Sequence, residues 1–293
     1  ILDQNIEGLE STINILETNE IPFVGIGNNL SEASKPFLIS KNNLKIGIYS
    51  CAEHEFSIAT EKSPGANPFD PFESLDHIYE LKKECDYVIV LYHGGKEHYR
   101  YPSPQLQKVC RKMVEKGADV VICQHSHCIG CFEEYKGSTI IYGQGNFIFD
   151  RKDNEYWNTS LLIELDINNE HININYIPLV KVKNIVRLAK NKIAEEILRS
   201  FHERSEEIKR KDFIEYNYSK YAKLNTQHYL RTLSGFGKWI SRIDRNLLNN
   251  YLLRKKYNID KLLAILNYLE CEAHHELLIR GLKELIIEKK TCK

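Results

Sequence analysis

Two short apolar runs, each followed by histidine, stand out in the hydrophobic pattern of this 293-residue chain. Residues 87–92 (YVIVLY) and 118–123 (ADVVIC) are rich in Val and Ile and have the length of buried strands. Residues 104–116 between them have a helical pattern, because Pro104 suits a first helical turn and Gly117 suits a helix end. The pattern predicts two strands joined by a helix, with histidines at both carboxyl ends, the edge where open α/β sheets form their sites.

The apolar periodicity before residue 180 adds further strands and helices around this centre. Short or alternating apolar runs predict strands at residues 21–25, 36–39, 44–50, 130–135, 139–142, 158–166 and 172–179. Helical stripes cover residues 8–19 and 71–85, and a long polar loop covers residues 52–69. We expect the last two strands to form a hairpin that completes the sheet.

Beyond residue 183 the pattern becomes helical throughout. Apolar stripes at helical spacing occupy residues 193–208, 213–233, 237–253, 259–269 and 274–287. We therefore predict two domains, residues 1–182 and residues 183–293. The predicted fold class is α/β (α+β), a β-sandwich flanked by helices and followed by an all-helical region. That region reads as a helical bundle or as a module that docks on a protein partner.

Composition narrows the classes of partner and the cellular location. The chain has 40 basic and 40 acidic residues, so its net charge favours neither nucleic acid nor a membrane surface. No apolar run approaches the 18 or more residues of a membrane span. The eight cysteines lack the spacing of a zinc ribbon, and as reduced packing residues they favour the cytoplasm. Because the chain starts at Ile1, we expect a longer natural protein, and the location stays open between cytoplasm and cell envelope.

The strongest chemical signal is the set of three histidines on the two strand-end loops, His93, His125 and His127. Neutral imidazole is the commonest nitrogen ligand of Zn, Fe and Mn sites, and loops after neighbouring parallel strands meet at one edge. The set therefore predicts a metal site, against the alternative that all three are unrelated surface histidines. Glu97 is a candidate proton donor or ligand-orienting residue. The nearby His98 is a weaker candidate for the same roles, and the more distant His54 is a weaker candidate for a position near the site.

The order and spacing of these motifs resemble the CapA family of capsule and poly-γ-glutamate synthesis proteins. The family's His-x-Gly-x-Glu and Gly-Ala-Asp motifs are matched by residues 93–97 and 117–119. Its Gly-His-x-His motif is matched by residues 124–127, and its Tyr-Ser-x-Gly-Asn-Phe motif by residues 142–147. Asp3, Gly8 and Thr12 fit the segment that follows the family's Asn-His pair. The resemblance covers residues 1–180 and implies a calcineurin-like metallophosphatase fold.

The resemblance also implies a function and a ligand set. It implies a metal-dependent hydrolase with two divalent ions of Mn, Fe or Zn, and an anionic polymer or small molecule as substrate. His93 and His125 would bind one ion and His127 the other, with Glu97 as a further catalytic residue. Substrate contacts would come from Gly94, Gly95, Gly145 and Asn146, which offer backbone amides to an anion.

This chain departs from the family pattern at several positions. The acidic ligands and the Asn-His pair belong upstream of Ile1, Gln124 replaces a Gly, and Gly143 replaces a Ser. We therefore expect the chain by itself to be inactive and to hold metal weakly. Two other functions stay open: a non-catalytic assembly component of polymer synthesis, and a phosphoesterase acting on a small molecule.

Overall fold

A computed structural model describes residues 4–54, 57–149, 154–182 and 185–291. Its contacts divide the chain into two compact units, Ile1–Tyr218 and Ser219–Lys293. Asp3 of the family resemblance lies outside the described residues, and so do residues 183 and 184, at which the expected domain boundary falls. That residues 1–182 and 183–293 are separate domains stays a prediction.

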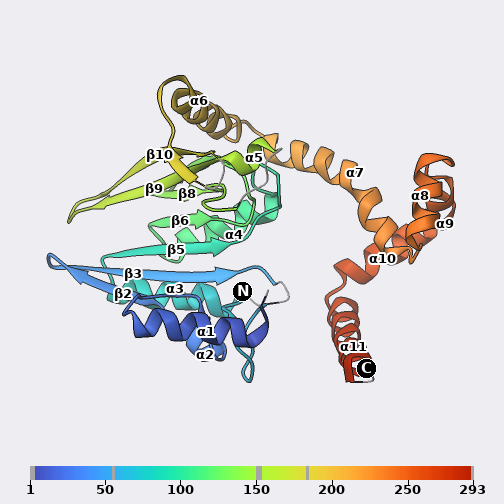
Figure 1. The fold of residues 1–293 in the computed structure, drawn as a ribbon, viewed down its shortest axis with the longest axis horizontal. Coiled ribbons are helices and arrows are strands. Elements are labelled where there is room, and N and C mark those ends of the chain that lie inside the picture. Colours follow the sequence, from blue (N-terminus) through green and yellow to red (C-terminus); the bar gives the residue numbers. More distant parts are fainter. Residues whose placement is uncertain (1–3, 55–56, 150–153, 183–184, 292–293) are drawn as a thin grey trace. The chain divides into compact units, whose positions relative to one another are not determined.

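The first unit is built on a six-stranded sheet with the order β2-β3-β5-β6-β8-β7 (Figure 1). Its strands are β2 (Phe37–Lys41), β3 (Leu44–Ala52), β5 (Tyr87–His93), β6 (Val120–Cys123), β7 (Phe132–Tyr135) and β8 (Ser138–Ile141). The four central strands β3, β5, β6 and β8 run parallel, and an antiparallel hairpin strand closes each edge. The predicted pair of strands with histidine at their carboxyl ends is therefore confirmed as the centre of a parallel sheet.

One face of this sheet is covered by the helices α3 (Glu73–Glu84) and α4 (Pro104–Glu115). Apolar side chains of both helices, among them Ile78 and Met113, are fully buried against Val88, Val90 and Val121 of the sheet. Helix α4 starts where the sequence predicts, because the Ser103 hydroxyl accepts a hydrogen bond from the Leu106 amide at 3.0 Å.

A second, three-stranded sheet covers part of the other face. It has the order β11-β10-β9, with β9 (Thr159–Ile167), β10 (Ile172–Val182) and β11 (Ile185–Leu188). Leu161 of β9 and Phe201 of helix α6 (Asn191–Glu207) are buried against Ile122 and Ile141 of the larger sheet. The prediction of a β-sandwich flanked by helices is confirmed. The expectation that β9 and β10 complete the first sheet is wrong, because the alternating apolar face of β9 packs onto that sheet instead of pairing within it.

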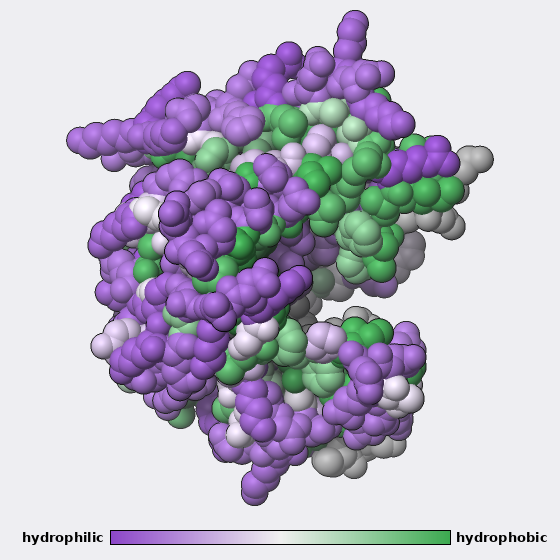
Figure 2. Space-filling model, turned by 90° about the vertical axis from the view of Figure 1, so that its left-hand side faces the viewer, coloured by the Kyte–Doolittle hydropathy of each residue, from purple (hydrophilic) through white to green (hydrophobic). Residues whose placement is uncertain are grey.

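Between the two sheets lies an apolar groove of about 460 Å³. Apolar side chains of β3, β5 and β6 line one wall, and the other wall is formed by β9 with the segment around Phe147. Figure 2 shows apolar residues gathered along a hollow on this side of the molecule. The second sheet thus leaves part of the larger sheet's apolar face uncovered by the described residues.

Two local expectations are corrected, and one strand was not expected. Residues 21–25 do not form a strand; instead β1 (Ile26–Gly27) pairs with β4 (Gly65–Ala66). Helix α2 (Leu30–Ala33), which follows α1 (Asn5–Thr18), contacts both of these strands. The single helix expected over residues 237–253 is divided into α8 (Lys238–Asn246) and α9 (Tyr251–Lys256). Its break follows from Asn249 and Asn250, which both adopt positive φ. Strand β11 had no counterpart in the prediction.

At the amino end of the larger sheet, one carboxylate joins three segments. Asp119, just before β6, accepts hydrogen bonds from the Val88 amide at 2.7 Å and from the Lys82 Nζ of α3 at 2.9 Å. Its neighbour Asp86 accepts from the Lys45 amide of β3 at 2.7 Å. These contacts fix the register of β3, β5 and β6 at the end of the sheet opposite to their carboxyl ends.

The second unit is helical. Helix α7 (Phe213–Leu233) begins in the first unit and continues into the second, which also holds α8, α9, α10 (Ile259–Glu270) and α11 (Glu272–Thr291). The prediction of a helical C-terminal region is confirmed from α6 onward, whereas β11 falls inside the range 183–293 that was expected to be all helical. Within the described ranges, no helix combines the length and the hydropathy that crossing a bilayer requires.

Candidate functional site at the carboxyl edge of the sheet

The parallel strands β3, β5, β6 and β8 all end at one edge of the larger sheet. The register pairs Ala52 of β3 with His93 of β5, so that Glu53 follows directly beside this histidine. The loop after β6 carries His125 and His127, and the loop after β8 carries Asn146. Residues as far apart in the sequence as Glu53 and Asn146 therefore meet at one rim.

His93 and His125 face each other across the gap between β5 and β6. The His93 Nε2 and the His125 Nδ1 lie 3.0 Å apart, and the ring centroids are 4.8 Å apart. Two nitrogens bound to one ion at ~2.1 Å stand about 3.0–3.4 Å from each other. The spacing of this pair therefore fits two neighbouring ligands of a single ion, as the sequence resemblance implies.

His127 is held in a separate orientation on the same loop. Its φ of 54° places it in the left-handed region, which an L-residue adopts at a cost. The buried Asn146 stabilises this conformation, because its Nδ2 donates to the His127 carbonyl at 3.0 Å and its Oδ1 lies 2.7 Å from the His127 Nδ1. With Oδ1 as the acceptor, Nδ1 carries the proton and Nε2 presents its lone pair. Such a partner on the second ring nitrogen is typical of a metal-ligating histidine.

An aromatic wall supports His127 and links the two histidine loops. The Trp157 indole stacks on the His127 ring, with centroids 5.0 Å apart and an angle of 14°. Its Nε1 donates to the His98 Nε2 at 3.1 Å, while the His98 amide donates to the Ser126 carbonyl at 2.8 Å. His98 therefore connects the loop after β5 to the loop after β6. Trp157 was missed from the sequence, because nothing in its local pattern distinguishes it from a packing residue.

The other predicted residues have different positions. Glu97 is exposed on the loop after β5, and His54 is exposed after β3. Gly94 lies against the ring of Tyr92, where an added Cβ would approach to 2.7 Å. Gly95 and Gly145 adopt φ values of 116° and 80°, which favour glycine. These glycines are thus required by the shape of the rim, whether or not they also contact a substrate.

The family departure at Gly143 has a steric reason. Gly143 has φ of 138°, and a Cβ at this position would lie 2.5 Å from the Ser126 Oγ in the histidine loop. The Ser126 hydroxyl is buried and donates to the Cys128 carbonyl at 3.1 Å. A side chain at residue 143 would therefore displace the Ser126 hydroxyl from its position in the histidine loop.

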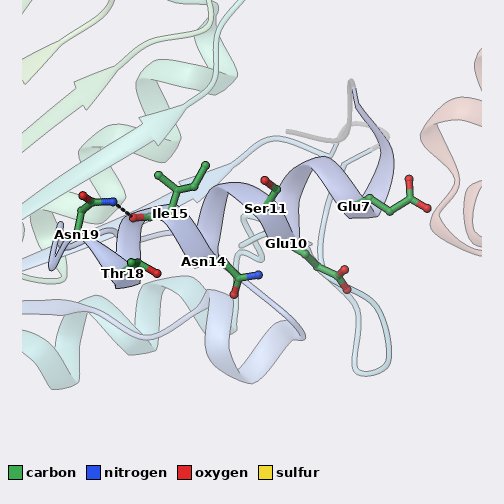
Figure 3. A pocket seen from close by; sticks show the side chains of 7 residues that line it. All are labelled: Glu7, Glu10, Ser11, Asn14, Ile15, Thr18 and Asn19. Carbon is green, nitrogen blue, oxygen red and sulfur yellow. Dashed lines mark hydrogen bonds between the residues drawn. The ribbon is translucent and has the colours of Figure 1, made fainter.

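Beside the histidine pair, a pocket of about 270 Å³ opens between the paired strands β1 and β4 and the sheet edge, and Glu53, His93 and Gln124 are among its lining residues. Burial, and after it the negative charge of Glu53, raise the pKa of the Tyr92 hydroxyl. Glu53 lines this pocket and was not predicted as a site residue. Its position directly after β3 is the sequence feature that could have identified it. A second depression, on α1, is lined only by that helix and its C-cap (Figure 3), and none of the predicted site residues lines it.

The histidines fit part of a metal centre. Across the described ranges, no group of three or more His, Cys, Asp or Glu side chains is arranged to hold one ion. His93 with His125 would supply two ligands of one ion, and His127, held by Asn146, one ligand of another. The remaining ligands would have to come from outside the described residues or from water.

Comparison with known proteins gives a consistent result for the first half of the chain. The family model described as bacterial capsule synthesis protein PGA_cap matches residues 1–151. The PGA biosynthesis protein CapA of Bacillus subtilis (strain 168) is 31% identical over 154 residues, which cover 51% of this chain and 40% of that protein. The capsule biosynthesis protein CapA of Bacillus anthracis is 29% identical over 155 residues, 51% of this chain and 38% of that protein.

The matched part spans about two fifths of the length of these two curated relatives. Among solved structures, a hypothetical protein from Thermus thermophilus aligns over 50% of this chain and 62% of its own, with 12% identity and a TM-score of 0.37.

Proposed function

Because the chain belongs to the bacterial capsule synthesis protein family (PGA_cap), we propose that it serves capsule or poly-γ-glutamate biosynthesis as a CapA-type protein. We further propose that the full protein is a metal-dependent hydrolase. The observation that carries this second proposal is the convergence of His93, His125 and His127 on one rim, with His127 oriented by the buried Asn146.

The proposal gives each residue a role. His93 and His125 would hold one divalent ion through the nitrogens that face each other, and His127 would hold a second ion through Nε2. Bound ions would supply an activated water and bind an anionic group of the substrate. Asn146 keeps the His127 ring and tautomer in place, and Trp157 fixes the plane of the ring. Proton transfer is assigned to Glu97, an exposed carboxylate on the loop that follows His93.

The metal part of the proposal is tested by titration calorimetry with Mn²⁺ and Zn²⁺. For the 293-residue chain we expect weak binding that His125→Ala abolishes, whereas the control His228→Ala, at an exposed histidine of α7, leaves it unchanged. A longer natural protein that contains the family's upstream motifs is expected to bind two ions. Two tight sites in the 293-residue chain would contradict the expectation of weak binding.

Turnover assays separate the substrate classes. Hydrolysis of γ-glutamyl amides by the longer protein, lost in His125→Ala, is the expected result. Activity on phosphate esters alone would identify a phosphoesterase instead. The alternative role as an assembly component is favoured by the lack of a three-ligand group in the described residues. A longer protein that binds no metal and hydrolyses neither substrate would establish that alternative.

A further inference from the structure

The helical unit contains a short segment whose charge differs strongly from that of the whole chain. Residues 237–256, called the basic hairpin here, comprise α8, α9 and the turn between them, and contain six basic residues and one acidic residue. The whole chain has 40 of each sign. The following helices α10 and α11 contain five basic and six acidic residues, so the excess of positive charge does not continue into them.

The single acidic residue of the basic hairpin is turned inward. Asp244 is fully buried and accepts hydrogen bonds from the Leu252 amide at 2.8 Å and the Leu253 amide at 3.3 Å. The Arg231 guanidinium of α7 lies 3.9 Å from the same carboxylate. Asp244 therefore joins α8 to α9, and it contributes no negative charge to the exposed surface.

The exposed surface of the hairpin combines basic and apolar side chains. In α8, Lys238, Arg242 and Arg245 follow each other at i, i+4 and i+7, which places them on one face of the helix. Apolar side chains that stay exposed occupy the neighbouring face and the turn: Trp239 (78% exposed), Ile240 (49%), Ile243 (47%), Leu247 (78%) and Tyr251 (53%). Arg254 and Lys255 of α9 are also exposed.

We propose that the basic hairpin binds the surface of a bilayer that contains anionic lipids. A helix with Trp and aliphatic residues on one face and Lys and Arg on the other lies in the lipid–water interface. The apolar face enters the acyl boundary, and the basic side chains reach the anionic headgroups, each adding about a five-fold factor to partitioning. Nucleic acid would satisfy the arginines but would leave Trp239 and Leu247 in water. The proposal needs no membrane-spanning helix.

Vesicle binding of the full chain tests the proposal. We expect co-sedimentation with phosphatidylcholine vesicles that contain phosphatidylglycerol, little binding to pure phosphatidylcholine, and release by high salt. The double variant Arg242→Gln/Arg245→Gln should bind about 25-fold more weakly. The matched control Lys261→Gln/Lys283→Gln removes the same charge from α10 and α11 and should bind like the unmodified chain.

Tryptophan fluorescence reports on the contact itself. The chain has two tryptophans, of which Trp157 is 7% exposed and Trp239 is 78% exposed, so a blue shift on adding vesicles reports Trp239. Brominated lipids should quench this emission, and Trp239→Ala should remove the shift while its circular dichroism stays helical. Equal binding to neutral vesicles, an unaffected Arg242→Gln/Arg245→Gln variant, or retention on an oligonucleotide without a shift of Trp239 would each overturn the proposal.

Discussion

The bond between Asn146 and His127 gives the sharpest test of how the rim is built. Asn146→Ala removes the hydrogen bond to the His127 carbonyl and the acceptor opposite its Nδ1. Because Asn146 is only 4% exposed, water replaces these partners incompletely. Two neutral hydrogen bonds at about 1 kcal/mol each predict a loss of about 2 kcal/mol in the free energy of unfolding. The left-handed backbone of His127, costly by itself, then loses its support.

The loss of stability is measured by equilibrium unfolding in urea. The control Asn19→Ala removes one hydrogen bond, from its Nδ2 to the Ile15 carbonyl, at an exposed helix end, and should cost less than about 0.5 kcal/mol. Asn146→Asp keeps the acceptor for Nδ1 but loses the donor to the carbonyl, so it should fall between the two.

The tautomer of His127 is a second, independent measurement. Long-range ¹H–¹⁵N spectra of the imidazoles should show His127 with its proton on Nδ1, and a mixture of tautomers in Asn146→Ala. The reasoning fails if the unmodified protein carries the proton on Nε2, or if Asn146→Ala unfolds at the same urea concentration as the unmodified chain. Either outcome would mean that Asn146 does not orient this histidine.

Three further predictions concern stability and burial. Hydrogen bonds from Lys136, and after it Lys112 and Tyr135, lower the pKa of Glu115 to about 2. The ionised carboxylate therefore stabilises the folded chain fully above the usual pKa of 4.5, and this contribution is lost as the pH falls toward 2. Melting curves should show that the stability difference between the unmodified chain and Glu115→Gln shrinks over this pH range. Phe201→Ala, at a fully buried position of α6, should cost about 3–5 kcal/mol in urea unfolding, whereas Leu224→Ala, at a residue 81% exposed on α7, should change it by less than about 0.5 kcal/mol. Burial raises the pKa of the thiols of Cys51, Cys110 and Cys131. A thiol reagent should therefore label these cysteines only after the chain unfolds. Equal labelling of the folded chain would contradict their burial.

The centre of the larger sheet was predictable because its signals are local. The Val- and Ile-rich runs of β5 and β6 are buried on both faces, and Ser103 with Pro104 defines the start of α4. Parallel strands then bring the following histidines to one edge. The placement of β9 was not predictable in the same way. The alternation of apolar and polar residues indicates which side chains of a strand are buried, but not which sheet they pack against.

The rim itself was predicted in its residues but not in its supporting contacts. His93 is the last residue of β5, His125 and His127 lie in the loop after β6, and the family motifs identified Asn146. The stacking of Trp157 on His127 depends on a return of the chain from a distant segment, which no local pattern records. The pairing of Gly143 with Ser126 likewise becomes visible only when two loops are placed side by side.

The carboxylate of Asp119 aligns the strands at one end of the larger sheet, and the histidines lie at the other end. It fixes β5 and β6 to α3 at the end away from the histidines, through contacts with Val88 and Lys82. Strand alignment at that end does not depend on the loops that carry the histidines. A substitution in those loops is therefore expected to disturb the rim locally and to leave the pairing of β5 with β6 at the opposite end in place.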